Sequence, residues 1–318
     1  MIQSRLNKRL NKRIKFKTPH KVFTQVLLVL LFMFESTIHK FTLIKIMIMK
    51  KILIHQIFYD EESKSKVMKG FIPLDNSNYK DNGWFEFSPM LSFLRTTELE
   101  DDVWYGFLSP RFFEKTNFSS EYVINLIEKI GHLGDVALFP TGWDQLSYFL
   151  NPWEQGEIWH PGIQEKTQLF LDSSNFKINL KNIVTDTTTS VFSNFIVAKK
   201  NYWIEWKKIS ELFFNYEEST ISNSYTKYRN STNKYLMKAF IQERFASLIL
   251  ATGKYKTFTP DISTSGAIFS QLFPNDINTR RLLITCDILK QRYRQDLSED
   301  LLNSYWKIRN TITFKRPV

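Results

Sequence analysis

The sequence predicts an α/β domain built on a mostly parallel sheet that is flanked by helices. Val103–Leu108 is a short apolar run that stops at Ser109-Pro110, which is typical of a central strand buried on both faces. Ser119–Ile130 follows as an amphipathic helix with a serine cap, and Asp135–Pro140 is a second apolar run. These three stretches predict a β-α-β unit whose two strands run parallel and side by side. Polar residues after such strands gather at the carboxyl edge of the sheet, where ligands bind in open α/β folds.

The remaining elements are predicted by the same kinds of signal. Ser88-Pro89 marks a helix start because proline is tolerated at the first helical position, and Asn201 caps another helix. Gly142–Gly162 shows little regular pattern, and the polar stretch Glu217–Asn233 predicts a mobile loop. We also expect strands at Ile52–Tyr59, Gly70–Asn76, Ile183–Asp186 and Val191–Val197, a long helix at Lys234–Thr252, and a helical C-terminal part within residues 277–310, with helices near Thr279–Tyr293 and Ser298–Arg309.

The positive charge of the chain is concentrated in its first 46 residues. The net charge is +11, and this segment holds ten Lys or Arg residues against one acid, Glu35. The other 272 residues are close to neutral, and they are enough for one large domain with a full core. The domain therefore has no excess of positive charge to neutralise phosphates, which argues against a nucleic-acid-binding protein.

Three interpretations of residues 1–46 stay open. A basic arm precedes the apolar run Val22–Phe34, which is shorter than the roughly 20 residues that a membrane-spanning helix needs. The segment is a peripheral membrane anchor, a signal peptide without a small-x-small cleavage site, or an extension upstream of a true start at Met47 or Met49. The last interpretation is favoured because Met49 leads directly into the first predicted strand, and it makes residues 47–318 a single domain.

The cysteine and histidine content excludes some classes of site. The single cysteine, Cys286, lies on a predicted helix and has no partner for an internal disulfide, which favours a reducing, cytoplasmic compartment. None of the five histidines stands at a metal-ligand spacing from a Cys or another His, which argues against a zinc site. The sequence also has no glycine-rich phosphate loop, no G-x-S-x-G and no H-E-x-x-H motif.

Five short motifs occur in order between residues 52 and 260. Phe71-Ile72-Pro73-Leu74 follows the first strand, and Asp102–Phe113 reads D-V-W-Y-G-F-L-S-P-R-F-F. Asp135–Pro140, Asn194–Trp203 and Gln242-Glu243-Arg244-Phe245 come next. In this order they resemble the GT-A-type glycosyltransferases of bacterial capsule and lipopolysaccharide gene clusters.

The resemblance implies a GT-A-like fold, a nucleotide-sugar donor, and a polysaccharide or glycolipid acceptor. It also implies Mn or Mg as a candidate cofactor, although the chain departs from the family at two points. Ser109-Pro110-Arg111-Phe112 stands where the family has His-Tyr-Arg-Arg, and the D-x-D metal motif is absent because Asp101-Asp102 precedes the strand. Metal dependence therefore stays open, and Asp186 is the one candidate metal ligand.

The first requirement of sugar transfer is to bind the nucleotide-sugar donor and stabilise its leaving group. Negative charge grows on the diphosphate as the glycosidic bond breaks, so a cation must stabilise it. Arg111 offers forked donors for this role unless it pairs with Glu114, and we expect Arg111→Ala to abolish donor binding without unfolding the protein. His55, near the end of the first strand, is a candidate contact for the nucleotide base, and Asp75 ends the second strand as a further donor contact.

The acceptor hydroxyl needs a general base. Asp144 is a candidate because it follows the strand Asp135–Pro140, and Trp143 beside it offers a ring on which a sugar can stack. His160, Glu154 and Glu157 lie in the same Trp-rich stretch and compete for the role.

Four further positions are candidates for the site. Asp186 binds a ribose, sugar or metal unless it only satisfies turn amides. The resemblance assigns Asn194 to the sugar. Glu243 is a candidate catalytic group and Arg244 a candidate donor contact, unless the two form a structural ion pair.

Two other functional classes stay open beside the enzyme. One is a non-catalytic sugar-binding or scaffold protein of the same fold, and the other is a membrane-surface assembly protein that docks residues 1–46 on anionic lipid. We expect a glycosyltransferase in the cytoplasm or at the inner face of the membrane, with Arg111 and Asp144 facing one cleft.

Overall fold

The computed structural model describes residues 52–77, 83–219, 225–227, 234–263 and 272–316. Ile52–Val318 form one compact unit. The extension at residues 1–46, with its three interpretations, lies outside the described residues. Most of the loop predicted at Glu217–Asn233 also lies outside them; its first residues belong to a helix and 225–227 to a strand.

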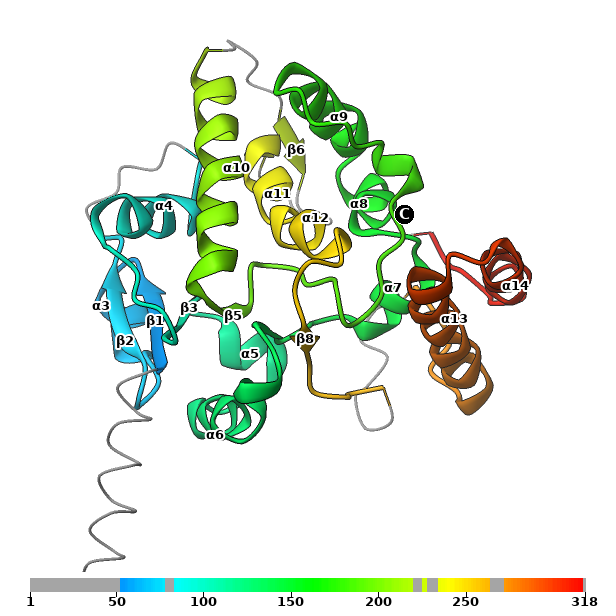
Figure 1. The fold of residues 1–318 in the computed structure, drawn as a ribbon, viewed down its shortest axis with the longest axis horizontal. Helices are drawn as coiled ribbons and strands as arrows, with labels where there is room; N and C mark the ends of the chain where they lie inside the picture. Colours follow the sequence, from blue (N-terminus) through cyan, green and yellow to red (C-terminus); the bar gives the residue numbers. More distant parts are fainter. Residues whose placement is uncertain (1–51, 78–82, 220–224, 228–233, 264–271, 317–318) are drawn as a thin grey trace, which may run out of the picture. The chain divides into compact units, whose positions relative to one another are not determined.

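A six-stranded sheet forms the centre of the unit (Figure 1). Its strands stand in the order β2-β1-β3-β5-β4-β8. β5 runs antiparallel to both of its neighbours, whereas the other neighbouring pairs are parallel. The predicted α/β class with a mostly parallel sheet flanked by helices is confirmed. The strands are β1 Ile52–Phe58, β2 Ile72–Asp75, β3 Trp104–Leu108, β4 Val136–Leu138, β5 Ile196–Lys199 and β8 Thr257–Phe258.

The predicted pairing of β3 with β4 is wrong. Both strands run in the same direction, but β5 lies between them, with Val197 opposite Gly106 on one side and Ala137 on the other. A Cβ at Gly106 would lie 2.8 Å from Cγ2 of Val197, so the glycine makes room for the inserted strand. The apolar pattern predicts strands, but it does not tell which strands are neighbours.

Helices cover the sheet and form the C-terminal part. Ser119 caps α6 by accepting a hydrogen bond from the Tyr122 amide, and this helix buries Val123 and Ile127 as its pattern predicts. A separate two-stranded sheet pairs β6 Tyr225–Lys227 with β7 Lys234–Leu236. The helices are α3 Glu61–Ser65, α4 Phe87–Thr96, α5 Phe112–Thr116, α6 Ser120–Ile130, α7 Trp143–Tyr148, α8 Pro152–Trp159, α9 Ile163–Ser173, α10 Lys200–Ser219, α11 Met237–Gln242, α12 Phe245–Ala251, α13 Ile277–Asp296 and α14 Glu299–Arg309, with single 3₁₀ turns at Gly131–Leu133 and Leu180–Asn182.

Several segments differ from their predictions. The irregular stretch predicted at Gly142–Gly162 contains α7 and α8; Asn151 caps α8 ahead of Pro152, a start signal that the Trp-rich composition concealed. Ile183–Asp186 is not a strand, and the strand predicted at Val191–Val197 is β5, a few residues later. The helix predicted at Lys234–Thr252 begins as β7 and breaks between α11 and α12.

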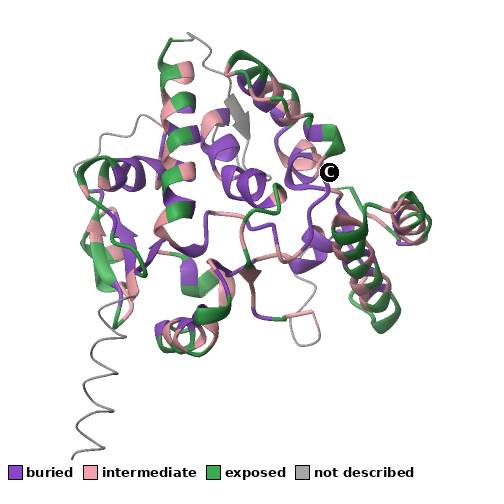
Figure 2. Ribbon diagram, in the orientation of Figure 1, coloured by how far each residue is buried: buried purple, intermediate pink, exposed green. Residues whose placement is uncertain are grey.

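A second apolar cluster joins the C-terminal helices to α7. Trp143, Leu283, Cys286 and Tyr305 are all buried in it. Nζ of Lys290 donates hydrogen bonds to two main-chain carbonyls at the end of α7, which fixes α13 there. Figure 2 shows exposed faces on α13 and α14, whereas residues 245–250 of α12 are buried. Burial raises the pKa of the Cys286 thiol to about 11, so it stays protonated and unreactive at neutral pH.

In the part of the chain that the structure describes, no helix combines the length and apolar character required to cross a membrane.

Candidate functional site

Several polar residues lie at one edge of the sheet, where the parallel strands end and the antiparallel strand β5 begins. β3 ends at Leu108 and leads through Ser109 into α5, while β5 begins at Ile196 opposite Leu138, the last residue of β4. Ser193 and Asn194 precede β5 and therefore lie at the carboxyl edge of the parallel strands. With Lys115 of α5, and with Gln242 and Glu243 at the end of α11, they form what we call the edge cluster.

Lys115 supplies the positive charge of the edge cluster. Its Nζ lies 3.0 Å from Oγ of Ser193 and 5.5 Å from the ring centroid of Phe195. The side chain is half-buried, and no described carboxylate lies within ion-pair distance of it. Among the described residues, no ion pair offsets the positive charge that Lys115 offers to an anionic ligand.

Asn194 lies beside this lysine in a constrained turn. Ser193 and Asn194 both have a positive φ, 64° and 52°. Nδ2 of Asn194 donates to Oε1 of Gln242 at 2.8 Å, and Nε2 of Gln242 donates in turn to the Ala239 carbonyl at 2.9 Å. Oδ1 of Asn194 is buried and has no hydrogen-bond partner among the described residues. These two hydrogen bonds, one between side-chain amides and one to the main chain, therefore leave the Oδ1 acceptor of Asn194 without a partner among the described residues.

Glu243 is the acid of the edge cluster. It follows the last residue of α11 and is half-buried. Burial raises the pKa of its carboxyl to about 7, with a smaller upward effect from Glu86, while Lys115 and Arg244 lower that pKa. A carboxyl of this pKa exchanges protons readily near neutral pH, which is the property that a general base needs.

Arg244 serves the fold in this structure. It is buried, and its guanidinium donates to the carbonyls of Pro152 and Phe240 and to Oε1 of Gln155, at 2.9, 2.6 and 3.1 Å. Burial lowers its pKa to about 10, so it stays charged at neutral pH. The arginine thus joins the break between α11 and α12 to α8, and it does not present its donors to a substrate.

Arg111 forms an ion pair with Glu114, which is the alternative to donor binding that the sequence leaves open. Its Nε and Nη2 donate to the two carboxylate oxygens of Glu114 at 2.9 and 2.6 Å, and both side chains are exposed. The hydrogen bonds and charge of Arg111 lower the pKa of Glu114. This pair lies on the surface of α5, one helical turn from Lys115.

Asp144 and Trp143 are enclosed by the fold. Asp144 is 0% exposed and Trp143 1%, and the guanidinium of Arg280 lies 5.2 Å from the Trp143 ring centroid. A carboxyl without exposed surface and an exposed Arg111 do not face one open cleft. Asp144 is therefore not accessible from a cleft in this structure.

The two candidate histidines are packed against aromatic rings. His160 stacks on Phe240 with ring centroids 3.7 Å apart. His55 is buried between Phe93 and Phe107, and burial lowers its pKa to about 4, so it is neutral at physiological pH. Neither ring is exposed to a substrate in this structure.

The acids predicted around these positions have structural partners. Asp186 is fully buried, 2.9 Å from Nη1 of Arg294, and accepts hydrogen bonds from the amide and hydroxyl of Thr188. Asp75, at the carboxyl edge, accepts from the amide and hydroxyl of Ser77, which lower its pKa. Glu154 pairs with Arg309, and Glu157 accepts from the amides of Gly162 and Gln164. The described residues contain no group of three or more His, Cys, Asp or Glu that could hold a metal ion.

Sequence reasoning missed Lys115, Ser193 and Glu86. A single lysine carries no signal in the chain, although Lys115 follows Arg111 by one helical turn. Its proximity to Ser193, 78 residues later, exists only in the folded protein.

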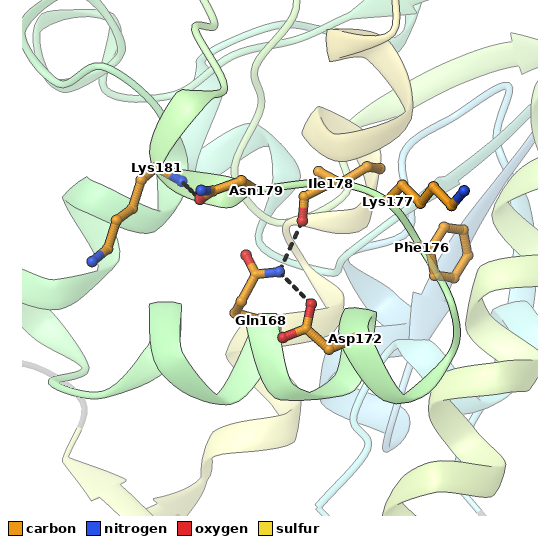
Figure 3. Close-up of a pocket in the computed structure, with 7 residues that line it drawn as sticks. All are labelled: Gln168, Asp172, Phe176, Lys177, Ile178, Asn179 and Lys181. Carbon is orange, nitrogen blue, oxygen red and sulfur yellow. Dashed lines mark hydrogen bonds between the residues drawn. The ribbon is translucent and has the colours of Figure 1, made fainter.

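A surface hollow of about 550 Å³ lies elsewhere, between α9 and the segment that follows it (Figure 3). Gln168 of α9 donates to Asp172 on the same helix and to the Ile178 carbonyl of the following segment, both at 2.8 Å, and the second bond connects the two sides. Its lining shares no residue with the edge cluster, and the other lining residues are Phe176, Lys177, Asn179 and Lys181.

Comparison with known proteins gives one distant structural likeness. No protein-family profile matches the chain, and no curated protein matches it either. The chain is similar to the apo structure of the bifunctional glycosyltransferase WbbM, with 15% identity and a TM-score of 0.39. The match covers 64% of this chain and 42% of that one, so this chain spans less than half of WbbM.

Proposed function

We propose that this protein is a glycosyltransferase that moves a sugar from a nucleotide-sugar donor to a polysaccharide or glycolipid acceptor. The observation that carries the proposal is that Glu243 and Lys115 lie near enough to interact electrostatically at the carboxyl edge of the parallel strands. One is a carboxyl with a pKa near neutrality, and the other is a cation without a carboxylate partner among the described residues. The order of the sequence motifs supports the same reaction class.

Glu243 acts as the general base in this proposal. The acceptor hydroxyl loses its proton as its oxygen attacks the anomeric carbon, and a base with a pKa near the working pH accepts that proton efficiently. Among the three predicted catalytic residues, Glu243 alone is half-buried, since Asp144 is 0% and His160 5% exposed. Asp144 and His160 would need a conformational change to reach an acceptor.

Lys115 stabilises the departing nucleoside diphosphate. The ammonium group lies beside the edge of the sheet, and a positive charge there offsets the charge that develops on the leaving group. Arg111 lies on the same short helix, and it becomes a second donor contact only when it leaves Glu114. Asn194 is 4% exposed, so its Oδ1 accepts a hydrogen bond from a sugar hydroxyl only after a conformational change, as for Asp144 and His160.

A requirement for manganese or magnesium is a proposal separate from sugar transfer itself. Divalent cations of this kind prefer several oxygen ligands at one point, and the described carboxylates of the edge are not grouped in that way. Asp186, the one predicted ligand, is held by Arg294 and Thr188. The described residues therefore do not fit the metal, and no step of the proposed reaction depends on it.

The proposal assigns the protein to the cytoplasm or the inner face of the membrane. Residues 1–46 would supply the membrane contact, and nucleic acid is not among the expected partners.

A non-catalytic sugar-binding protein of the same fold is the second candidate. The engagement of Arg111 by Glu114 favours it, because the motif arginine is then not presented to a donor. A membrane-surface assembly protein is the third class, and removal of residues 1–46 tests it.

Thermal-shift measurements with nucleoside diphosphates and nucleotide sugars, with and without Mn²⁺, test the proposal. We expect at least one nucleotide sugar to raise the melting temperature and to be hydrolysed slowly without an acceptor. Stabilisation without any turnover would support the sugar-binding alternative, and no stabilisation by any compound would remove the enzyme proposal.

A further inference from the structure

A row of aromatic side chains leads from the start of α4 to α11. The ring centroids of Phe85 and Tyr235 are 5.9 Å apart, and those of Tyr235 and Phe240 are 6.5 Å apart. Phe85 and Tyr235 are both half-buried, whereas Phe240 is 8% exposed. The first two residues of this row, Phe85 and Tyr235, are therefore partly exposed.

The backbone at Phe85 is strained. Its φ is +46°, in the left-handed region that a bulky side chain rarely adopts. The residues on either side explain how this conformation is held, because Trp84 and Phe87 are both fully buried and their rings stack at 4.7 Å. Asn76, directly after β2, donates a hydrogen bond to the Phe85 carbonyl at 3.4 Å. The fold therefore maintains a half-exposed ring at a conformational cost.

The aromatic row lies next to the proposed base. Phe240 and Glu243 are three residues apart at the end of α11, so they lie on one side of that helix end. Glu86, which directly follows Phe85, is half-buried and close enough to Glu243 to interact with it electrostatically. One acid thus directly follows Phe85, and the other lies one helical turn from Phe240.

We infer that Phe85 and Tyr235 form the platform on which the ring of the acceptor sugar rests, with Glu86 and Glu243 accepting hydrogen bonds from its hydroxyls. The inference rests on the proposed function and names the subsite that receives the acceptor. A pyranose has an apolar face of C–H groups and a rim of hydroxyl donors. Aromatic rings bordered by carboxylates complement both features, since the rings cover the apolar face and the carboxylates accept from the rim.

This surface replaces Trp143, the ring that the sequence predicts for this task. Trp143 is 1% exposed and packs in the C-terminal cluster, whereas Phe85 and Tyr235 combine partial exposure with a nearby base. The signal in the sequence is weak, because Phe85 precedes a helix and Tyr235 lies 150 positions later.

Saturation-transfer difference NMR on the full-length chain tests the inference without a donor. The probes are the methyl glycosides of glucose, galactose and mannose at millimolar concentration. We expect saturation of the ring C–H protons of at least one glycoside. Phe85→Gly, which suits a positive φ, and Tyr235→Ala should each weaken its binding about tenfold, while Phe85→Tyr keeps it.

The matched control is Tyr122→Ala. Tyr122 of α6 is 42% exposed and stacks on the half-buried Phe118 at 5.1 Å, so it belongs to a partly exposed aromatic pair that lies outside the aromatic row. This variant should bind the glycoside as the unaltered protein does. Phe85→Leu provides a second test if Phe85→Gly does not fold, as judged by circular dichroism.

The outcomes separate this inference from the proposed function. Glycoside binding that depends on Phe85, in a protein that consumes no nucleotide sugar, upholds the platform and removes the enzyme. Sugar transfer with an unchanged acceptor KM in Phe85→Gly and Tyr235→Ala removes the platform and keeps the enzyme. No saturation of any glycoside in the unaltered protein overturns the inference.

Discussion

Asn194 and Gln242 join the start of β5 to the end of α11 through a hydrogen bond of 2.8 Å between Nδ2 and Oε1. Both residues are buried, and the second amide hydrogen bond of Gln242 goes to the Ala239 carbonyl. This chain of amides fixes which atom of Asn194 remains an acceptor, and it holds Glu243 beside the carboxyl edge.

Replacing Gln242 with leucine should destabilise the protein by about 1–3 kcal/mol, because the buried Nδ2 of Asn194 and the Ala239 carbonyl both lose their partner. Urea unfolding followed by tryptophan fluorescence measures the change. Gln242→Glu is the informative comparison, since it keeps an acceptor for Asn194 but no donor for Ala239. Equal stability of Gln242→Leu and the unaltered protein would show that the amide chain contributes nothing.

Arg244→Met should cost more, about 3–5 kcal/mol, because the variant leaves the carbonyls of Pro152 and Phe240 and the Gln155 amide without a donor in a buried position. Arg292→Met is the matched control, since Arg292 is exposed and pairs with Asp296 one turn away. The control should change the free energy of unfolding by less than about 1 kcal/mol. Similar losses for the two variants would contradict a structural role specific to Arg244.

Lys115→Met should weaken the binding of a nucleoside diphosphate roughly 10- to 100-fold, the range expected for one charge-assisted contact. Arg111→Met removes a cation from the same helix, and its effect should be smaller because Glu114 already holds that charge. Isothermal titration of both variants decides between the two cations. A larger loss in Arg111→Met would restore the arginine to the role that the sequence predicts.

The pKa of Glu243 also predicts how stability depends on pH. Its folded-state pKa of about 7 lies above the ordinary value of 4.5, so the folded protein binds its proton more tightly than the unfolded chain does. Stability is therefore lost as the pH rises between these two values. Glu243→Gln should be more stable than the unaltered protein by roughly 1–3 kcal/mol near pH 9 and equally stable near pH 4. Parallel stability curves across this range would show that the carboxyl is not perturbed.

The strands and amphipathic helices of this fold follow from the sequence because each depends on local pattern. Val103–Leu108 and Ser119–Ile130 were predicted within a residue of β3 and α6. The order of strands depends on packing across the whole chain, and the insertion of β5 beside Gly106 has no local signal. The ion pair of Arg111 with Glu114 is local and was one of its two predicted alternatives.

The residues of the candidate site were harder to predict. Which of several similar side chains stays accessible depends on the folded structure and not on the local sequence. Asp144 and Glu243 are both acids in apolar surroundings in the sequence, but the fold encloses one and leaves the other half-buried. Lys115 reaches Ser193 only across the folded sheet. Asn194 is predicted by the resemblance and Glu243 by its place among apolar residues of a predicted helix, and the two lie at the same edge. His55, His160, Asp186 and Arg244 have structural partners.

The pH dependence of nucleotide-sugar turnover by the unaltered protein, Glu243→Gln and Asp144→Asn tests the central claim most directly. The account predicts that turnover by the unaltered protein rises through about pH 7, and that Glu243→Gln loses this rise and is roughly 10²- to 10⁴-fold slower above pH 7. Asp144→Asn should keep the same pH profile. Full activity in Glu243→Gln, with the pH-dependent step abolished in Asp144→Asn instead, would contradict the account.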